Sequence, residues 1–153
     1  MAAGKVQHSS VSSATVLVVD DNKDAVDIIA RLLSHHGMTA VRAYSGLECL
    51  EIVRDRPVDV IILDVMMPGM DGLEVCRQLK QIAPAPPVIL LTAKDDMATR
   101  AAGMSLGVSE FVVKPVNNRD LLVRIKTQLS TRQWEREIDQ TSAIIEPQKK
   151  PGS

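Results

Sequence analysis

Four short apolar runs in the sequence each end at a polar side chain that could take part in chemistry. The residues that follow these runs are Asp20-Asp21, Asp64, Thr92 and Lys114. Short runs of aliphatic and β-branched residues are typical of strands that are buried on both faces of a parallel sheet. Ligands of such sheets bind outside the carboxyl ends of the strands, so we expect these side chains to share one edge.

Three carboxylates at one edge of a sheet repel one another unless a cation neutralises them. Oxygen ligands of this kind suit Mg²⁺, which binds through one or two carboxylates together with water and phosphoryl oxygens. Asp20, Asp21 and Asp64 therefore predict a magnesium site that faces a phosphoryl group.

The rest of the sequence predicts alternating strands and helices. The expected strands are 15–20, 38–44, 58–64, 88–92 and 110–114, and the expected helices are 22–36, 47–55, one starting near Asp71, 95–106 and one starting after Asn118. Asp20 or Asp21 is expected to cap the first helix and Asp71 the third, whose apolar face should include Ile82. In the fourth helix we expect a break at Gly103. This alternation predicts an α/β fold with a doubly wound, five-stranded parallel sheet and five helices.

Length and composition predict one domain with two tails. Residues 1–13 are polar and expected to be disordered, 14–131 form the domain, and 132–153 are expected to extend the last helix before a disordered tail. The net charge of −1 and the three aromatic residues argue against binding of nucleic acid. The apolar runs are too short for a membrane span and no secretion signal is evident, so we expect a cytoplasmic protein.

The two cysteines, Cys49 and Cys76, lie among apolar neighbours in expected helices. We interpret them as small buried side chains in a reducing compartment, because their spacing supports neither a disulfide nor a metal pair.

Several short motifs, in this order, resemble the receiver domain of bacterial two-component response regulators. They are Asp20-Asp21, the segment 64–72 (Asp-Val-Met-Met-Pro-Gly-Met-Asp-Gly), Thr92-Ala93 and Lys114-Pro115. The resemblance runs from about residue 15 to about residue 129. It implies a CheY-like (flavodoxin-like) sheet with strand order 2-1-3-4-5.

The resemblance also implies roles for the polar residues. Asp64 would accept a phosphoryl group from a histidine kinase or a phosphotransfer protein. Asp21, Asp64 and the backbone carbonyl of Met66 would bind Mg²⁺ directly, and Asp20 would act through metal-bound water. Lys114, after which a cis peptide bond to proline is expected, would pair with a phosphoryl oxygen.

By the same resemblance, Thr92 would be a switch hydroxyl and Phe111 a switch aromatic. Phosphorylation would then change the face built by the fourth helix, the fifth strand and the fifth helix, where a downstream partner or a second copy could bind. Two simpler interpretations remain open: Thr92 could merely cap a helix, and Phe111 could be only a core residue.

Three functions compete at this stage. The first is a phosphorylation-controlled signalling switch that is no enzyme beyond its own aspartyl phosphorylation and dephosphorylation, either alone or as the N-terminal receiver of a larger regulator. The second is a Mg²⁺-dependent phosphohydrolase with an aspartyl-phosphate intermediate. Such enzymes have a general acid two residues after the nucleophile, where this chain has Met66. The third is an unphosphorylated scaffold, against which the full set of acids and Lys114 argues.

Overall fold

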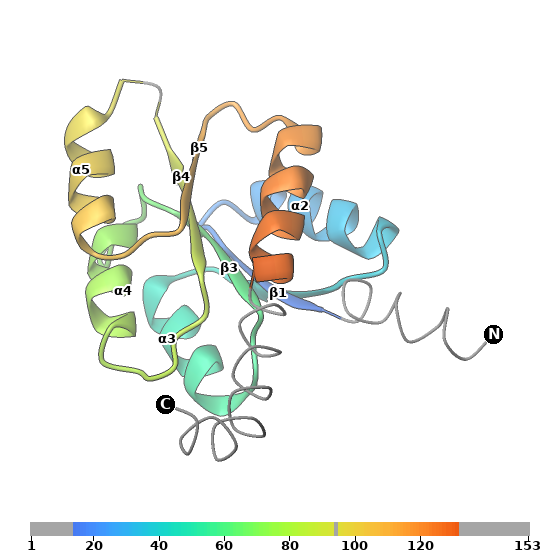
Figure 1. The fold of residues 1–153 in the computed structure, drawn as a ribbon, viewed down its shortest axis with the longest axis horizontal. Helices are drawn as coiled ribbons and strands as arrows, with labels where there is room; N and C mark the ends of the chain where they lie inside the picture. The colour runs from blue at the N-terminus through green and yellow to red at the C-terminus, as the bar shows by residue number, and fades with distance from the viewer. Residues whose placement is uncertain (1–13, 94, 132–153) are drawn as a thin grey trace, which may run out of the picture.

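The computed structural model describes residues 14–93 and 95–131 and shows a single parallel sheet with helices on both faces (Figure 1). Its strands are β1 (Thr15–Val19), β2 (Thr39–Ala43), β3 (Val60–Asp64), β4 (Val88–Thr92) and β5 (Glu110–Val113). They pair in the order β2-β1-β3-β4-β5, and all four pairs are parallel. The expected sheet and its strand order are confirmed.

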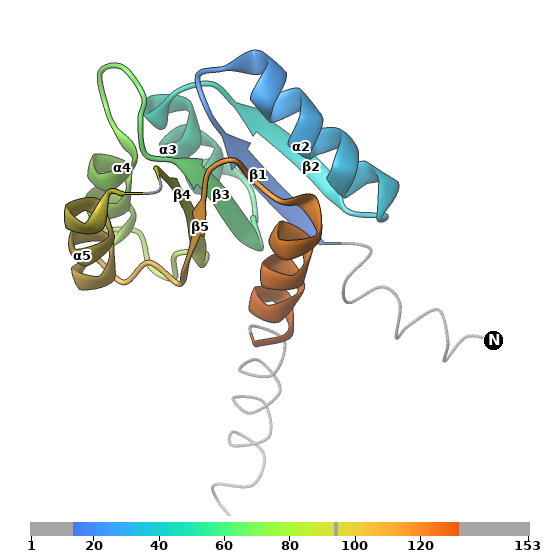
Figure 2. The same cartoon turned by 90° about the horizontal axis from the view of Figure 1, so that it is seen from above.

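Five helices cover the sheet within the described residues. They are α2 (Lys23–His35), α3 (Gly46–Asp55), α4 (Gly72–Leu79), α5 (Met97–Ser105) and a C-terminal helix at residues 118–131. The first and the last of these cover one face, and α3, α4 and α5 cover the other (Figure 2). None of the helices in 14–93 and 95–131 is long and apolar enough to cross a membrane.

The central strands divide their side chains between two apolar cores. Val16 and Val18 of β1 pack beneath α2, whereas Leu17 and Val19 pack on the side of α3 and α4. Because both faces of β1, β3 and β4 are covered, their apolar runs are continuous rather than alternating.

Side-chain caps fix where the helices begin. Asn22, Ser45, Asp71 and Asp96 each accept a hydrogen bond from the backbone N–H three residues further on. Such caps satisfy N–H groups that have no partner within the helix. Asp71 caps α4 as predicted, but the predicted cap of the first helix, Asp20 or Asp21, and the cap considered for the fourth, Thr92, are not used. Asn22 and Asp96 hold these positions instead.

Some local expectations were wrong. Gly103 lies inside α5 and does not break it, because the glycine is buried against the sheet. Ile82, expected on the apolar face of the third helix, comes after the end of α4 but still packs against the same core. The expected tails, 1–13 and 132–153, lie outside the described residues.

Candidate functional site

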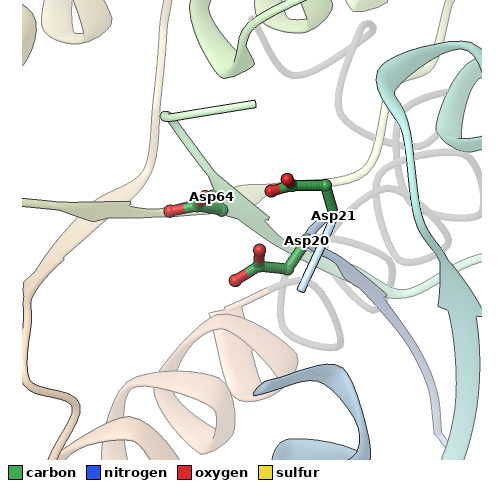
Figure 3. A group of neighbouring side chains, drawn as sticks. All are labelled: Asp20, Asp21 and Asp64. Carbon is green, nitrogen blue, oxygen red and sulfur yellow. The ribbon is translucent and has the colours of Figure 1, made fainter. Parts of the chain in front are cut away.

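Three carboxylates meet at the carboxyl edge of the sheet (Figure 3). Asp20 and Asp21 follow β1, and Asp64 is the last residue of β3. One carboxylate oxygen from each lies within 4.8 Å of the other two. Asp20 and Asp64 are buried, with 6% and 2% of their surface exposed, while Asp21 faces solvent. The cluster is therefore a group of oxygen ligands that is open on one side.

Strand register explains why the acids meet. Val19 of β1 lies beside Leu63 of β3, so Asp20 and Asp64 come next at the same level of the sheet. The N–H of Asp20 donates to the carbonyl of Ala43 at 3.2 Å, which holds the end of β1 against β2. The positions of the acids thus follow from the parallel sheet.

Burial and neighbouring charge work against ionisation of Asp20. Burial raises the pKa of its carboxyl above the usual value, and the charges of Asp64 and Asp21 act in the same direction. A hydrogen bond from the backbone N–H of Asn22, 3.0 Å long, and the charge of Lys114 oppose this rise in pKa. A cation held between the acids would offset the repulsion that remains.

Lys114 brings a positive charge to the buried acid. It directly follows β5, and its ammonium forms an ion pair with Oδ1 of Asp64. Its backbone N–H donates to the carbonyl of Thr92 at 2.8 Å, and the peptide bond to Pro115 is cis, as the family resemblance implied. The lysine side chain thus reaches from β5 to the end of β3.

Thr92 ends β4 with a buried hydroxyl. The residue is 1% exposed, and its Oγ1 has no hydrogen-bond partner within 14–93 and 95–131. A buried polar atom without a partner costs about 1–3 kcal/mol. Such an atom at the edge of a polar site favours a role toward a group that arrives from outside.

Phe111 lies apart from the carboxylates. It pairs with Leu90 in the β4–β5 ladder, and its ring packs against Gly103 of α5. It is partly buried and belongs to the core on the side of α3 and α4. The structure therefore brings together the acids and Lys114, with Thr92 at the same edge, but leaves Phe111 beneath α5.

The segment after Asp64 is held by a close backbone contact that sequence reasoning did not single out. The N–H of Gly72 donates to the carbonyl of Val65 at 2.9 Å. A Cβ at Gly72 would lie 2.7 Å from the carbonyl oxygen of Asp64, which is closer than real Cβ atoms come. Gly69 makes the turn between them with φ of +78°. The Asp-Gly pair at 71–72 was the available signal, since glycine marks such close approaches.

A cavity of about 510 Å³ opens over the acids. Besides the charged residues and Met66, apolar side chains line it, among them Ile28 of α2, Pro115 and Val116. Ile28 and Met66 are 60% and 70% exposed. The site therefore has an acidic floor and a partly apolar rim, and the sequence analysis had missed this rim.

Comparison with known proteins agrees with this geometry. Residues 16–126 match the family model described as the response regulator receiver domain. The response regulators MprA of Mycobacterium ulcerans and Mycobacterium leprae are 42% and 44% identical over 118 and 115 residues, which are 76% and 74% of this chain. Each match covers 50% of the relative, so the chain spans about half the length of these curated relatives.

Solved structures show the same fold. A response regulator receiver domain protein from Clostridium thermocellum aligns with a TM-score of 0.75 at 32% identity, over 79% of this chain and 98% of that one. NtrX from Brucella abortus aligns with a TM-score of 0.77 at 28% identity, over 83% of this chain and 29% of that one. The chain thus belongs to the family of response regulator receiver domains.

Proposed function

We propose that this receiver domain is a switch controlled by phosphorylation of Asp64, with a histidine kinase or a phosphotransfer protein as the donor. The observation that carries the proposal is the position of the Asp64 carboxylate. It is buried, with an oxygen within 4.8 Å of those of Asp20 and Asp21, and it is paired with the ammonium of Lys114.

The proposed reaction is a transfer to an oxygen nucleophile. A carboxylate oxygen of Asp64 forms a bond to phosphorus while the bond from phosphorus to the donor's imidazole nitrogen breaks, and that nitrogen keeps the electron pair. A carboxylate needs no base to ionise it near neutral pH. Catalysis of such a transfer consists mainly of positioning the reactants and of placing positive charge near the phosphoryl oxygens. The ammonium of Lys114 would supply part of that charge.

We propose Mg²⁺ as the cofactor, because the donor set fits it. Asp20, Asp21, Asp64 and the backbone carbonyl of Met66 would hold the ion, and all are hard oxygen donors. Burial and then the charges of Asp64 and Asp21 raise the pKa of Asp20, and a cation bound among the acids would oppose this rise. When bound, the ion would supply charge to the phosphoryl oxygens.

The response would follow from the new charge. A phosphoryl group brings roughly two negative charges and three strong acceptor oxygens. The unpartnered hydroxyl of Thr92 could donate to one of these oxygens, and Phe111 would change position with it. The output face would be formed by α5, β5 and the helix at 118–131, the fourth helix, fifth strand and fifth helix of the sequence analysis.

Partners and organisation are part of the proposal. The receiver domain would span 14–131, and its output would pass to an effector protein or to a linked effector domain, which the half-length match to the relatives supports. Dimerisation would use the output face. We propose a cytoplasmic location and no direct binding of nucleic acid or membrane. We also propose that the domain does not turn over external substrates, since Met66 stands where a phosphohydrolase would need a general acid.

The proposal is tested by labelling the protein with acetyl phosphate and Mg²⁺ and mapping the label by mass spectrometry. We expect the label on Asp64 and its loss in Asp64→Asn. Asp71→Asn is the matched control, because asparagine also caps a helix and should leave α4 intact. A label on another residue, or full labelling of Asp64→Asn, would overturn the assignment. Turnover of an external phosphomonoester would instead favour the phosphohydrolase.

A further inference from the structure

Helix α5 packs a glycine against the sheet. Among its nine residues, Gly103 is the one that is buried, whereas Met97 and Met104 are 68% and 70% exposed. Beneath Gly103 lie the ring of Phe111 on β5 and the side chain of Leu90 on β4. The helix therefore lacks the row of large apolar side chains that usually anchors a helix to a sheet.

The contact between Gly103 and Phe111 leaves no room for a side chain. A Cβ at residue 103 would lie 2.9 Å from Cε1 and 3.1 Å from Cζ of the Phe111 ring, and 3.4 Å from Cδ2 of Leu90. Two carbon atoms attract best at about 3.5–4.0 Å, so an added methyl group would force the ring or the helix to shift. The ring can lie where it does because residue 103 has no side chain.

The same face of the sheet also carries Thr92. Leu90 pairs with Phe111 and Thr92 pairs with Val113, and residues two apart on a strand point to the same side. The hydroxyl proposed to donate a hydrogen bond to the phosphoryl group, the ring and the glycine therefore lie on one side of β4 and β5.

We infer that Gly103 is a positioning residue for Phe111, and that their contact transmits the position of the ring to α5. This inference rests on the proposed function, because it assumes that Phe111 moves when Asp64 is phosphorylated. It adds to that proposal the partner of the ring and the helix that responds. The exposed surface of α5, with Met97 and Met104, is then the part of the output face that responds to the position of the ring.

The test is a double-mutant cycle on the binding of beryllofluoride, a phosphoryl mimic, in the presence of Mg²⁺. The four proteins are the wild type, Gly103→Ala, Phe111→Leu and the double variant. Leucine lacks the ring atoms that a methyl group at residue 103 would meet. Alanine also favours helix formation, but both backgrounds share that gain and it cancels in the cycle.

We expect Gly103→Ala to change the dissociation constant by about fivefold or more in the wild type and by less than about twofold in Phe111→Leu. Gly103→Ala should also change the hydrogen exchange rates of residues 97–105 in the wild-type background, and should change them much less in the Phe111→Leu background. Phe111→Ala repeats the cycle if the leucine variant is poorly folded. Equal effects in both backgrounds would overturn the inference, whereas a wild type that binds no beryllofluoride would overturn the proposed function itself.

Discussion

Helices α2 and α5 both begin beside the site, but they are held very differently. Over 13 residues, α2 buries Val26, Ile29, Ala30 and Leu33, while α5 buries only Gly103 over nine. In addition, Nε of Arg100 in α5 is buried without a hydrogen-bond partner in the described residues. α2 follows the acids, and α5 follows Thr92. The difference suggests that the charged side of the site needs a rigid support and the hydroxyl side needs one that can move.

The largest expected difference between the two helices is in core substitutions. Leu33→Ala in α2 should lower the free energy of unfolding by about 2–5 kcal/mol, because Leu33 is fully buried. Met104→Ala in α5 should change it by less than about 0.5 kcal/mol, because 70% of Met104 is exposed. Urea denaturation measures both. Similar losses in the two variants would mean that α5 is anchored as firmly as α2.

Magnesium should act at the acids that follow β1 and end β3, and should leave the local opening of α5 unchanged. At ten times its dissociation constant, an ion that binds only the folded state stabilises it by about 1.4 kcal/mol. We expect slower hydrogen exchange at residues 20–25 and unchanged exchange in α5 until beryllofluoride is added. Asp21→Asn should lose most of the magnesium effect on thermal stability. Slower hydrogen exchange in α5 with magnesium alone would show that the ion also stabilises α5, and would contradict this difference between the acids and α5.

The cap of α2, Asn22, tests how firmly this helix is coupled to the core. Asn22→Ala should cost about 1 kcal/mol of global stability, because α2 is part of the core and unfolds with it. Asn22→Ser is the control, as serine can accept the same hydrogen bond. If the alanine variant instead frays α2 locally and keeps its global stability, α2 is less firmly coupled to the core than its burial indicates.

The smallest expected effect is a local dependence on pH. Hydrogen bonds from the side chain and the backbone of Thr99 lower the pKa of Asp96 below its usual 3.8. The ionised carboxylate of Asp96 therefore contributes to the stability of α5 above pH 3.8. This contribution is lost as the pH falls from 3.8 through the lowered pKa of the folded state. In NMR spectra the Thr99 amide should shift over this range more than the amide of Ala25, whose cap Asn22 does not titrate.

Asp96→Asn should abolish this pH response, since asparagine caps without a charge. If the Thr99 amide still shifts with pH in that variant, a group other than Asp96 causes the shift.

Much of the sheet could be predicted because its residues face two covered surfaces. Val60-Ile61-Ile62-Leu63 reads as a strand without any alternation, and the acid that follows it marks the carboxyl edge. That Asp20 and Asp64 would share this edge follows from parallel strands alone. Their roles as metal ligand and phosphoryl acceptor remain proposals.

Other features depend on contacts between distant residues. Local propensity disfavours glycine inside a helix, and so the sequence predicted a break at Gly103. Burial against Phe111, eight residues later and on a different element, overrides that preference. Likewise, Asn22 caps α2 because Asp20 instead accepts a hydrogen bond from the N–H of Asn22. A sequence with several adjacent capping residues cannot reveal which of them is used.

The close contact between Gly72 and the backbone of Asp64 limits how Asp64 could be engineered into another parallel sheet. Copying the aspartates and the lysine onto new strand ends would leave the following segment free to choose another path. Any side chain at residue 72 would collide with the carbonyl of Asp64, so the first turn of α4 would have to be carried along with the acid. The smallest segment that could carry Asp64 into another sheet in this geometry is therefore a strand, the loop after it and the first turn of the next helix.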